Sequence, residues 1–226
     1  MASSWIRALK VFGKELIADP RPIGAACPSS PKLARRVAQA VGNKPGNFIL
    51  EIGAGTGAIT AALLRHCAPM HRLIAVERSP SMVQHLRHRF ADLRIIEGDA
   101  CRLSETLRHL RDVDPRSITH VVSSLPLRSL PDNDVELITG EFSRLLAHGA
   151  QLVQYTYNLK EGSSGVFSRL RRKSASVVWF NLPPALVEVF ASAPERQPAR
   201  PSPGVRAPAF SVGAGAKPVN AAPRHS

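Results

Sequence analysis

The sequence predicts an α/β protein with a mostly parallel sheet, and three observations carry that prediction. Short apolar runs of strand length alternate along the chain with segments of helical spacing. A glycine-rich turn joins the first of these strands to a helix, and the next strand ends in an acidic residue. In an open α/β sheet, ligands bind outside the carboxyl ends of the strands. The fold class therefore also predicts where the functional site lies.

The predicted elements follow one another in a regular order. Apolar runs predict strands at residues 48–50, 73–76, 93–96, 118–123, 150–155 and 177–180. Helical spacing predicts helices at residues 4–17, 31–41, 58–64, 104–111 and 134–146. Ser29 and Ser30 precede the second of these helices and are candidate caps. We expect a core sheet between an N-terminal helix and an irregular C-terminal end.

The glycine-rich turn at residues 51–57 is the most informative stretch of the chain. The missing side chains at Gly53, Gly55 and Gly57 let the backbone turn tightly and let a ligand lie against it. The helix that begins near Ala58 directs its free N–H groups at that ligand. The turn therefore predicts a binding site at the end of the first strand.

Two acidic residues at strand ends indicate that the ligand contains an adenosine group. Glu77 ends the second strand, where its carboxylate can accept hydrogen bonds from both ribose hydroxyls. Asp99 follows the third strand and can accept a hydrogen bond from an adenine amino group.

Two cofactor classes fit these residues. Gly53, Gly55 and Ala58 satisfy the relaxed dinucleotide pattern, which favours a nicotinamide cofactor. Glu51, two residues before the first glycine, would instead repel an incoming pyrophosphate. A carboxylate at this position suits S-adenosyl-L-methionine, whose amino group and sulfonium are both cationic.

The spacing Glu-x-Gly-x-Gly-x-Gly, followed by an acid after the second strand and Gly-Asp-Ala after the third, resembles the class I methyltransferase signature. The resemblance implies a single Rossmann-like domain with a mostly parallel seven-stranded sheet whose last strand is antiparallel. The cofactor-binding residues expected on this basis are Glu51, Gly53, Gly55, Gly57, Glu77, Asp99, Ala100 and Ser124. A tight turn in some other α/β protein remains the alternative.

Length and composition predict one catalytic domain with an extension at each end. We expect an amphipathic helical segment at residues 1–20, the catalytic domain at residues 21–193 and a disordered tail rich in Pro, Ala and Arg at residues 194–226. The three cysteines are widely spaced and form no Cys-x-x-Cys pair, which favours a reducing cytoplasm over disulfides or zinc. The histidines also lack metal-ligand spacing, so no metal is expected.

The net charge of +13 indicates a polyanionic partner, which is either nucleic acid or an anionic membrane. Five basic residues and one acidic residue lie beyond position 193, so about +9 remains on the rest of the chain. The basic, amphipathic helix at residues 4–17 fits either packing on the domain or lying in a membrane interface.

The segment after the fourth strand helps to choose between these partners. Methyltransferases of this fold that act on amino groups usually carry Asn/Asp-Pro-Pro-Tyr or Asn-Leu-Pro-Tyr here, and this chain has Ser-Leu-Pro-Leu at residues 124–127. The backbone carbonyls of Ser124 and Leu125 could still orient an amine, but stacking on a flat base would be lost. The departure argues against a nucleic-acid base as substrate.

The chain as a whole resembles the bacterial phospholipid N-methyltransferases that associate with membranes. The resembling segments are residues 24–30, 50–57, 122–131, 154–157 and 179–185. The Ser-Leu-Pro-Leu and Asn-Leu-Pro-Pro-Ala segments are the specific ones, whereas many unrelated families share the cofactor turn. No part of residues 194–226 resembles the family.

This resemblance implies methyl transfer to the amino group of phosphatidylethanolamine, and onward to phosphatidylcholine, at the inner face of the cell membrane. Tyr157 and then Tyr155 are the candidates beside the acceptor, because an aromatic face stabilises a methylated ammonium. The N-terminal helix and the basic segment at residues 166–173, near the crevice mouth, would hold the enzyme on anionic lipid.

Two other functions remain open at this point. An RNA adenine N6-methyltransferase of the rRNA dimethyltransferase type shares the cofactor turn and would explain the positive charge. A non-catalytic binding protein on a decayed methyltransferase fold is disfavoured by the intact Glu51, Gly53, Gly55, Glu77 and Asp99.

Overall fold

A computed structural model describes residues 29–42 and 48–193 of the chain. The predicted helix at residues 4–17 and the predicted tail at residues 194–226 lie outside the described residues. The membrane role of the first and the disorder of the second therefore stay predictions.

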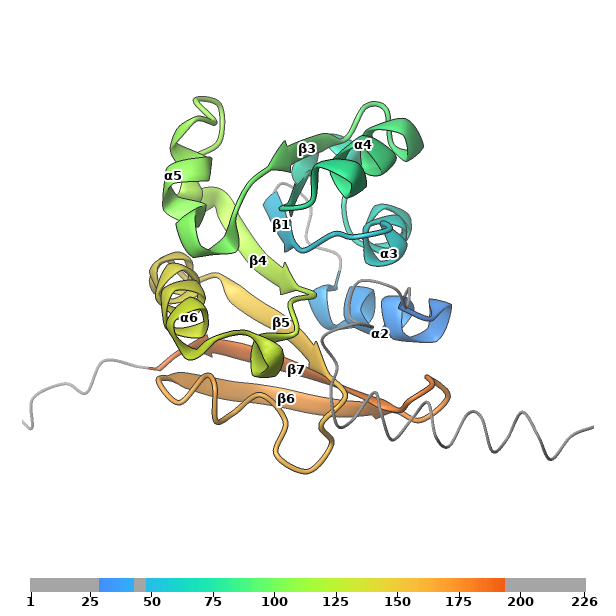
Figure 1. Cartoon of the computed structure of the whole chain (residues 1–226), viewed down its shortest axis with the longest axis vertical. Helices are drawn as coiled ribbons and strands as arrows, with labels where there is room; N and C mark the ends of the chain where they lie inside the picture. Colours follow the sequence, from blue (N-terminus) through green and yellow to red (C-terminus); the bar gives the residue numbers. More distant parts are fainter. Residues whose placement is uncertain (1–28, 43–47, 194–226) are drawn as a thin grey trace, which may run out of the picture. The chain divides into compact units, whose positions relative to one another are not determined.

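The described residues form one seven-stranded sheet with the strand order β3-β2-β1-β4-β5-β7-β6 (Figure 1). The strands are β1 (Phe48–Ile52), β2 (Leu73–Glu77), β3 (Arg94–Glu97), β4 (Ile118–Ser123), β5 (Gln151–Thr156), β6 (Leu170–Val178) and β7 (Ala185–Ser192). The first five pair in parallel, whereas β7 is antiparallel to both β5 and β6. The predicted seven-stranded, Rossmann-like sheet with an antiparallel last strand is thereby confirmed.

Helices cover both faces of the sheet. On one face lie α2 (Pro31–Val41), α3 (Ala58–His66) and α4 (Pro80–Arg89), and on the other lie α5 (Leu103–Arg108) and α6 (Asp132–Ala147) (Figure 1). Short 3₁₀ turns occur at Met70–Arg72, Ala100–Arg102, Pro115–Ser117 and Leu127–Ser129. Each layer of helices packs its own apolar cluster against the sheet, so the parallel strands are buried on both faces, which explains their continuous apolar runs.

The second half of the sheet departs from the sequence expectation. A strand was expected only at residues 177–180, but β6 begins at Leu170, and residues 179–180 already belong to the turn that follows it. The first residues of β6 are polar and exposed, so they carry no apolar pattern that predicts a strand. Pairing with the buried β7 defines this edge strand instead.

The register of the strands decides which loops face the ligand. Ile52 of β1 pairs with Ser123 of β4, which pairs with Gln154 of β5, so these strands end together at what we call the carboxyl edge. Leu186 near the start of β7 pairs with Thr156 at the end of β5, which places the β6–β7 turn at this edge as well.

The basic segment at residues 166–173 lies elsewhere. Arg171 pairs with Ala191, which pairs with Gln151 at the beginning of β5, so this segment is at the opposite, amino edge of the sheet. The expectation that it lies near the crevice mouth was wrong. The chain runs along the whole of β6 before it reaches the carboxyl edge.

Candidate cofactor and acceptor site

The glycine-rich turn lies between β1 and α3 at the carboxyl edge, and its three glycines have different roles. All three adopt positive φ angles, of 74° at Gly53, 52° at Gly55 and 77° at Gly57. A Cβ on Gly53 would lie 2.9 Å from Leu125, and one on Gly57 would lie 2.5 Å from Phe90. A Cβ on Gly55 would have no neighbour nearer than 4.0 Å. Gly53 and Gly57 therefore permit close packing within the protein, and Gly55 is the one beside open space.

Glu77 at the end of β2 fixes the shape of this turn. One of its carboxylate oxygens accepts a hydrogen bond from the Gly55 N–H at 2.9 Å, and the other accepts one from the Ser79 N–H at 2.9 Å. Each carboxylate oxygen has a second lone pair, so both can also accept a ribose hydroxyl. The acid predicted to bind the ribose thus also holds the ligand-facing glycine in place.

Glu51 is fully buried at the end of β1 and lacks partners. Neither of its carboxylate oxygens accepts a hydrogen bond, and the hydroxyl of the neighbouring Thr60 is also without one. Burial raises the pKa of the Glu51 carboxyl from 4.5 to about 8; the Thr60 hydroxyl and N–H oppose the shift, and the Glu77 charge adds to it. A cationic ligand at the glycine turn would compensate this unpartnered carboxyl.

These residues fit S-adenosylmethionine. A cationic ligand with an adenosine group would use the space beside Gly55, the free lone pairs of Glu77 and the uncompensated carboxyl of Glu51. Asp99 and Ala100 follow β3 at the same edge, and Asp99 accepts a hydrogen bond from the Cys101 N–H at 2.9 Å, which fixes the start of the 3₁₀ turn there.

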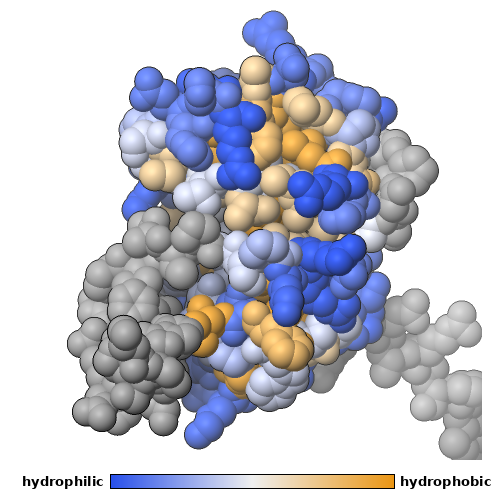
Figure 2. Space-filling model, turned by 90° about the vertical axis from the view of Figure 1, so that its right-hand side faces the viewer, coloured by the Kyte–Doolittle hydropathy of each residue, from blue (hydrophilic) through white to orange (hydrophobic). Residues whose placement is uncertain are grey.

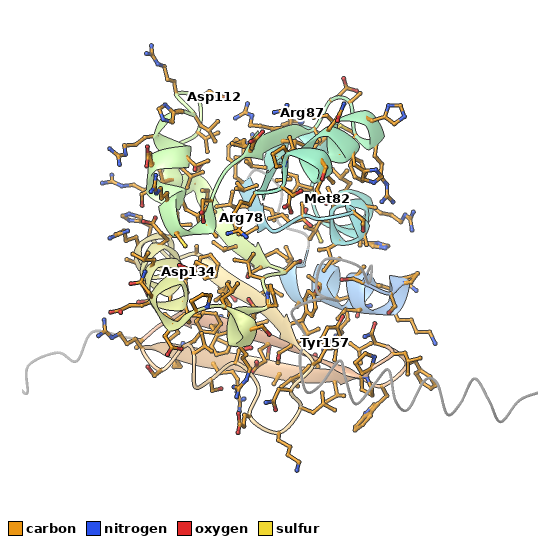
Figure 3. All side chains as sticks on the ribbon, viewed as in Figure 1. Arg78, Met82, Arg87, Asp112, Asp134 and Tyr157 are labelled. Carbon is orange, nitrogen blue, oxygen red and sulfur yellow. The ribbon has the colours of Figure 1, made fainter. Side chains whose placement is uncertain are left out.

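The thiol of Cys101 lies in this region but is not activated. Burial raises its pKa to about 11, with Asp99 and Asp134 adding to the shift and Arg78 opposing it. Figure 3 shows Arg78 and Asp134, which come from the β2–α4 connection and from α6. A thiol with this pKa stays protonated at neutral pH, so it is not a candidate nucleophile.

In the segment after β4, one backbone carbonyl is left to hold the amine of the substrate that receives the methyl group. The Leu125 carbonyl already accepts hydrogen bonds from the Leu127 N–H at 2.9 Å and the Gln154 side chain at 3.1 Å. Both of its lone pairs are used, so the expectation that Leu125 could orient an amine was wrong. The Ser124 N–H donates to Ile52, but none of the hydrogen bonds among the described residues uses the Ser124 carbonyl oxygen.

Gln154 is a site residue that the sequence interpretation missed. Its side chain is buried and donates to the carbonyls of Leu125 at 3.1 Å and Tyr155 at 2.8 Å, which ties the ends of β4 and β5 together. Its Oε1 atom is buried without a partner. The expectation for the segment Gln-Tyr-Thr-Tyr concerns only its two aromatic residues.

The two candidate tyrosines lie together at the end of β5. The rings of Tyr155 and Tyr157 meet edge to face, with their centroids 5.9 Å apart, and both pack against the apolar cluster beneath α2. Figure 3 labels Tyr157. The Tyr155 hydroxyl lies 3.2 Å from the Ser29 hydroxyl, just before α2. Since Gln154 is in register with Ser123, both tyrosines are at the carboxyl edge beside the post-β4 segment.

The basic segment at residues 166–173 has structural contacts of its own. Phe167 is 2% exposed and packs against Phe142 and Phe190, so its ring is not available to lipid. Arg172 forms an ion pair with the buried Glu188 at 3.1 Å. Phe167 is therefore not available to a membrane and Arg172 is engaged within the protein, whereas lipid binding by the segment as a whole stays a prediction.

Within residues 29–42 and 48–193, no helix is long and apolar enough to cross a bilayer. In the same residues, no group of three or more His, Cys, Asp or Glu side chains could hold a metal ion.

Comparison with known proteins agrees with this geometry. Residues 49–149 match the family model described as a methyltransferase domain. An ornithine lipid N-methyltransferase of Singulisphaera acidiphila is 31% identical over 171 residues, covering 72% of this chain and 85% of that protein. A ribosomal RNA small subunit methyltransferase A of Thermobifida fusca is 27% identical over 231 residues, covering 92% of this chain and 71% of that protein.

A solved structure shares the fold. The TehB-like SAM-dependent methyltransferase of Corynebacterium glutamicum superposes with a TM-score of 0.51 at 20% identity, covering 81% of this chain and 100% of that chain. Together with the glycine turn, the strand-end acids and the sheet order, these similarities settle the family. The chain belongs to the class I S-adenosylmethionine-dependent methyltransferases.

Proposed function

We propose that this enzyme methylates the amino group of phosphatidylethanolamine, and of its mono- and dimethyl derivatives, at a membrane surface. The observation that carries the proposal is the 31% identity to an ornithine lipid N-methyltransferase across 85% of that protein. Ornithine lipid and phosphatidylethanolamine both present an amino group on a lipid, so both would undergo the same reaction, methylation of that amino group.

The post-β4 segment supports a lipid acceptor over a nucleobase. Residues 124–127 contain neither an amide side chain nor an aromatic ring, and Leu125 packs beside Gly53. A flipped adenine would need a stacking partner and a hydrogen-bond acceptor for its amino group. A small aliphatic amine needs only the acceptor, which the Ser124 carbonyl can provide.

For methyl transfer, the main contribution of the protein is to position the amine. S-adenosylmethionine supplies an electrophilic methyl group on its sulfonium. The acceptor ammonium must lose a proton to water before its nitrogen can attack, and we assign the Ser124 carbonyl to hold an N–H group of the amine in the first two rounds. In-line positioning then supplies most of the acceleration. Tyr157, with Tyr155 behind it, would stabilise the methylated ammonium through its ring face.

We also propose that the reaction takes place at the cytoplasmic face of the cell membrane. The three cysteines are widely spaced and form no Cys-x-x-Cys pair, which suits a reducing compartment. The surplus of positive charge suits an anionic lipid surface.

Methylation of ribosomal RNA is the second candidate. The relative from Thermobifida fusca aligns with 92% of this chain, and the net charge of +13 also suits RNA. The missing aromatic and amide groups after β4 argue against it.

One assay separates these functions. Purified full-length protein is incubated with labelled S-adenosylmethionine and one of three acceptors: phosphatidylethanolamine vesicles, ornithine lipid vesicles or ribosomal RNA. We expect label in phosphatidylethanolamine, and the ratio of mono-, di- and trimethylated lipid counts the steps. Label only in ornithine lipid would support a lipid amine as the acceptor but would replace phosphatidylethanolamine by ornithine lipid as the substrate. Label only in RNA would refute the proposal.

A Tyr157→Ala variant, with Tyr155→Phe as its conservative companion, tests the acceptor side of the site. We expect Tyr157→Ala to lower turnover of the monomethyl and dimethyl lipids more than that of the unmethylated one, because only the methylated ammonium gains from the ring. An equal loss on all three lipids would contradict that role.

A further inference from the structure

The turn between β6 and β7 exposes an unusual set of side chains. Trp179 is 68% exposed, Phe180 is 81% exposed and Leu182 is 63% exposed. Within the described residues, only two other large hydrophobic side chains are exposed, Met70 at 36% and Leu137 at 48%. Single exposed apolar residues are normal, but three within four positions mark an interaction site.

The turn has a defined structure that holds these side chains outward. Between them lies Asn181, which is 4% exposed and donates a hydrogen bond from its side chain to the Pro183 carbonyl at 2.6 Å. Its backbone N–H donates to Val178 at 3.3 Å. The buried polar residue fixes the turn, and the apolar residues project from it.

Cations of α2 flank this turn. The Lys32 ammonium lies 4.2 Å from the centroid of the Phe180 ring, and Arg36 donates to the Ser176 hydroxyl at 2.8 Å. Arg35 on the same helix is exposed. Residues 29–42 and 174–187 together contain these three basic residues and no Asp or Glu. Figure 2 views the side of the molecule that carries α2, where apolar patches adjoin strongly hydrophilic ones.

The position of the turn links it to the acceptor site. Val178 pairs with Ala185 at the carboxyl edge, and Leu186 pairs with Thr156, between the two candidate tyrosines. Tyr155 in turn lies 3.2 Å from Ser29, at the start of the same helix that carries the cations. A surface that bound the turn would therefore lie against the mouth of the acceptor site.

We propose that residues 179–182 insert into the interface of an anionic phospholipid bilayer while Lys32, Arg35 and Arg36 contact the lipid phosphates. Exposed Trp, Phe and Leu beside a group of cations are the side chains that such an interface takes up. This deepens the proposed function, and it rests on that function for the choice of lipid as partner. The basic segment at the amino edge plays no part in it.

Tryptophan fluorescence gives a direct test, because the chain has two tryptophans, Trp5 and Trp179. In full-length Trp5→Phe protein, the emission reports Trp179 alone. Without lipid, we expect emission typical of a tryptophan in water. On addition of vesicles of phosphatidylethanolamine and phosphatidylglycerol, we expect a blue shift, and bromine on the acyl chains near the interface should quench the emission.

Two results would overturn the proposal. Emission that stays unshifted and unquenched while the protein sediments with the vesicles would mean that another part of the chain binds lipid. Emission that is already blue-shifted without lipid would mean that residues 1–28 or a second copy of the chain cover the turn.

Paired variants measure how much the turn contributes. We expect Phe180→Ser with Leu182→Ser to lower the vesicle partition coefficient about tenfold. Leu137→Ser, which removes an exposed leucine on α6, should change it less than about twofold. Calorimetric binding of S-adenosylmethionine shows whether each variant is folded. Equal partitioning of the double variant and the control would refute the insertion.

These readouts are independent of the acceptor that the enzyme methylates. Insertion of Trp179 without label in phosphatidylethanolamine would support the docking surface and refute only the substrate. Methylation of phosphatidylethanolamine with Trp179 remaining in water would refute the docking surface and leave the substrate standing.

Discussion

Among the residues that the structure describes, two glutamates are completely buried, and their surroundings differ. Glu188 on β7 accepts a hydrogen bond from the Ser163 N–H at 2.6 Å and pairs with Arg172 at 3.1 Å. Glu51 on β1 has no hydrogen-bond partner for either oxygen. Both residues lie on central strands, so burial alone does not separate them.

The difference separates a structural carboxylate from a functional one. Glu188 ties the 158–167 loop to the sheet, and its neighbours within the protein compensate its charge. Glu51 directly precedes the glycine turn, in which Gly55 is the glycine whose Cβ direction is open. A buried carboxyl left without partners costs stability, and a cationic ligand that supplies the partner recovers it. Whether a buried acid has hydrogen-bond or ion-pair partners indicates its role better than its burial does.

The largest effect is expected from Glu51→Gln. The folded-state pKa of about 8 exceeds the unfolded value of 4.5, so the folded protein binds this proton more tightly. Its contribution to stability is therefore present below pH 4.5 and is lost as the pH rises towards 8. The variant should be more stable than the parent by about 4 kcal/mol at pH 8, with the difference vanishing near pH 4.5. Urea unfolding of the cofactor-free protein at several pH values measures this.

The same variant should bind S-adenosylmethionine more weakly, because the amide cannot become an anion. Glu188→Gln is the matched control, and it should lower stability, since Arg172 loses its partner. If both variants shifted stability in the same direction, the distinction between the two glutamates would fail.

The next effect concerns Arg172. Its replacement by Ala leaves the Glu188 carboxylate buried with only the Ser163 N–H, and we expect a loss of about 2 kcal/mol in unfolding free energy. Arg171→Ala, at the neighbouring exposed position, should leave the melting temperature unchanged. An unchanged unfolding free energy in Arg172→Ala would show that the ion pair with Glu188 does not hold the 158–167 loop.

Gly55→Ala tests the open space beside the glycine turn. The added Cβ enters the open region beside the turn, so we expect affinity for S-adenosylmethionine to fall about tenfold in calorimetry. Gly149→Ala is the control, because Gly149 also has a positive φ, of 94°, and open space around it, but lies at the amino edge before β5. Equal affinities in the two variants would place the ligand elsewhere.

The smallest effect is expected from the remaining cations of the basic segment. Arg169→Ala and Arg171→Ala should each change vesicle partitioning by less than about twofold, because both lie at the amino edge, away from the acceptor mouth. A fivefold loss, about 1 kcal/mol, would restore this segment as the main lipid contact.

Much of the cofactor side could be predicted because its signals are local. A turn that needs three positive φ angles requires glycines at fixed spacing, and an acid that must reach the turn comes directly after the next strand. The roles of the individual glycines could not be predicted. Leu125 and Phe90, which fill the space beside Gly53 and Gly57, lie far from them in the sequence.

The acceptor side was predicted less well, for two physical reasons. Gln154 shows its importance only through contacts with the end of another strand, which no spacing within its own segment reveals. Residues 171–175 of the edge strand β6 are exposed one after another, so the beginning of β6 has no alternation of apolar and polar residues that predicts a strand.

The sequence by itself determined the fold class, the cofactor turn and the excess of positive charge, since each depends on composition or on neighbours a few residues apart. Only the tertiary structure decided which groups share an edge of the sheet. The direction of β6 places its basic beginning at the amino edge and the apolar turn that follows it, residues 179–182, at the carboxyl edge. Strand direction and register bring distant residues together, and both depend on pairing across the whole sheet.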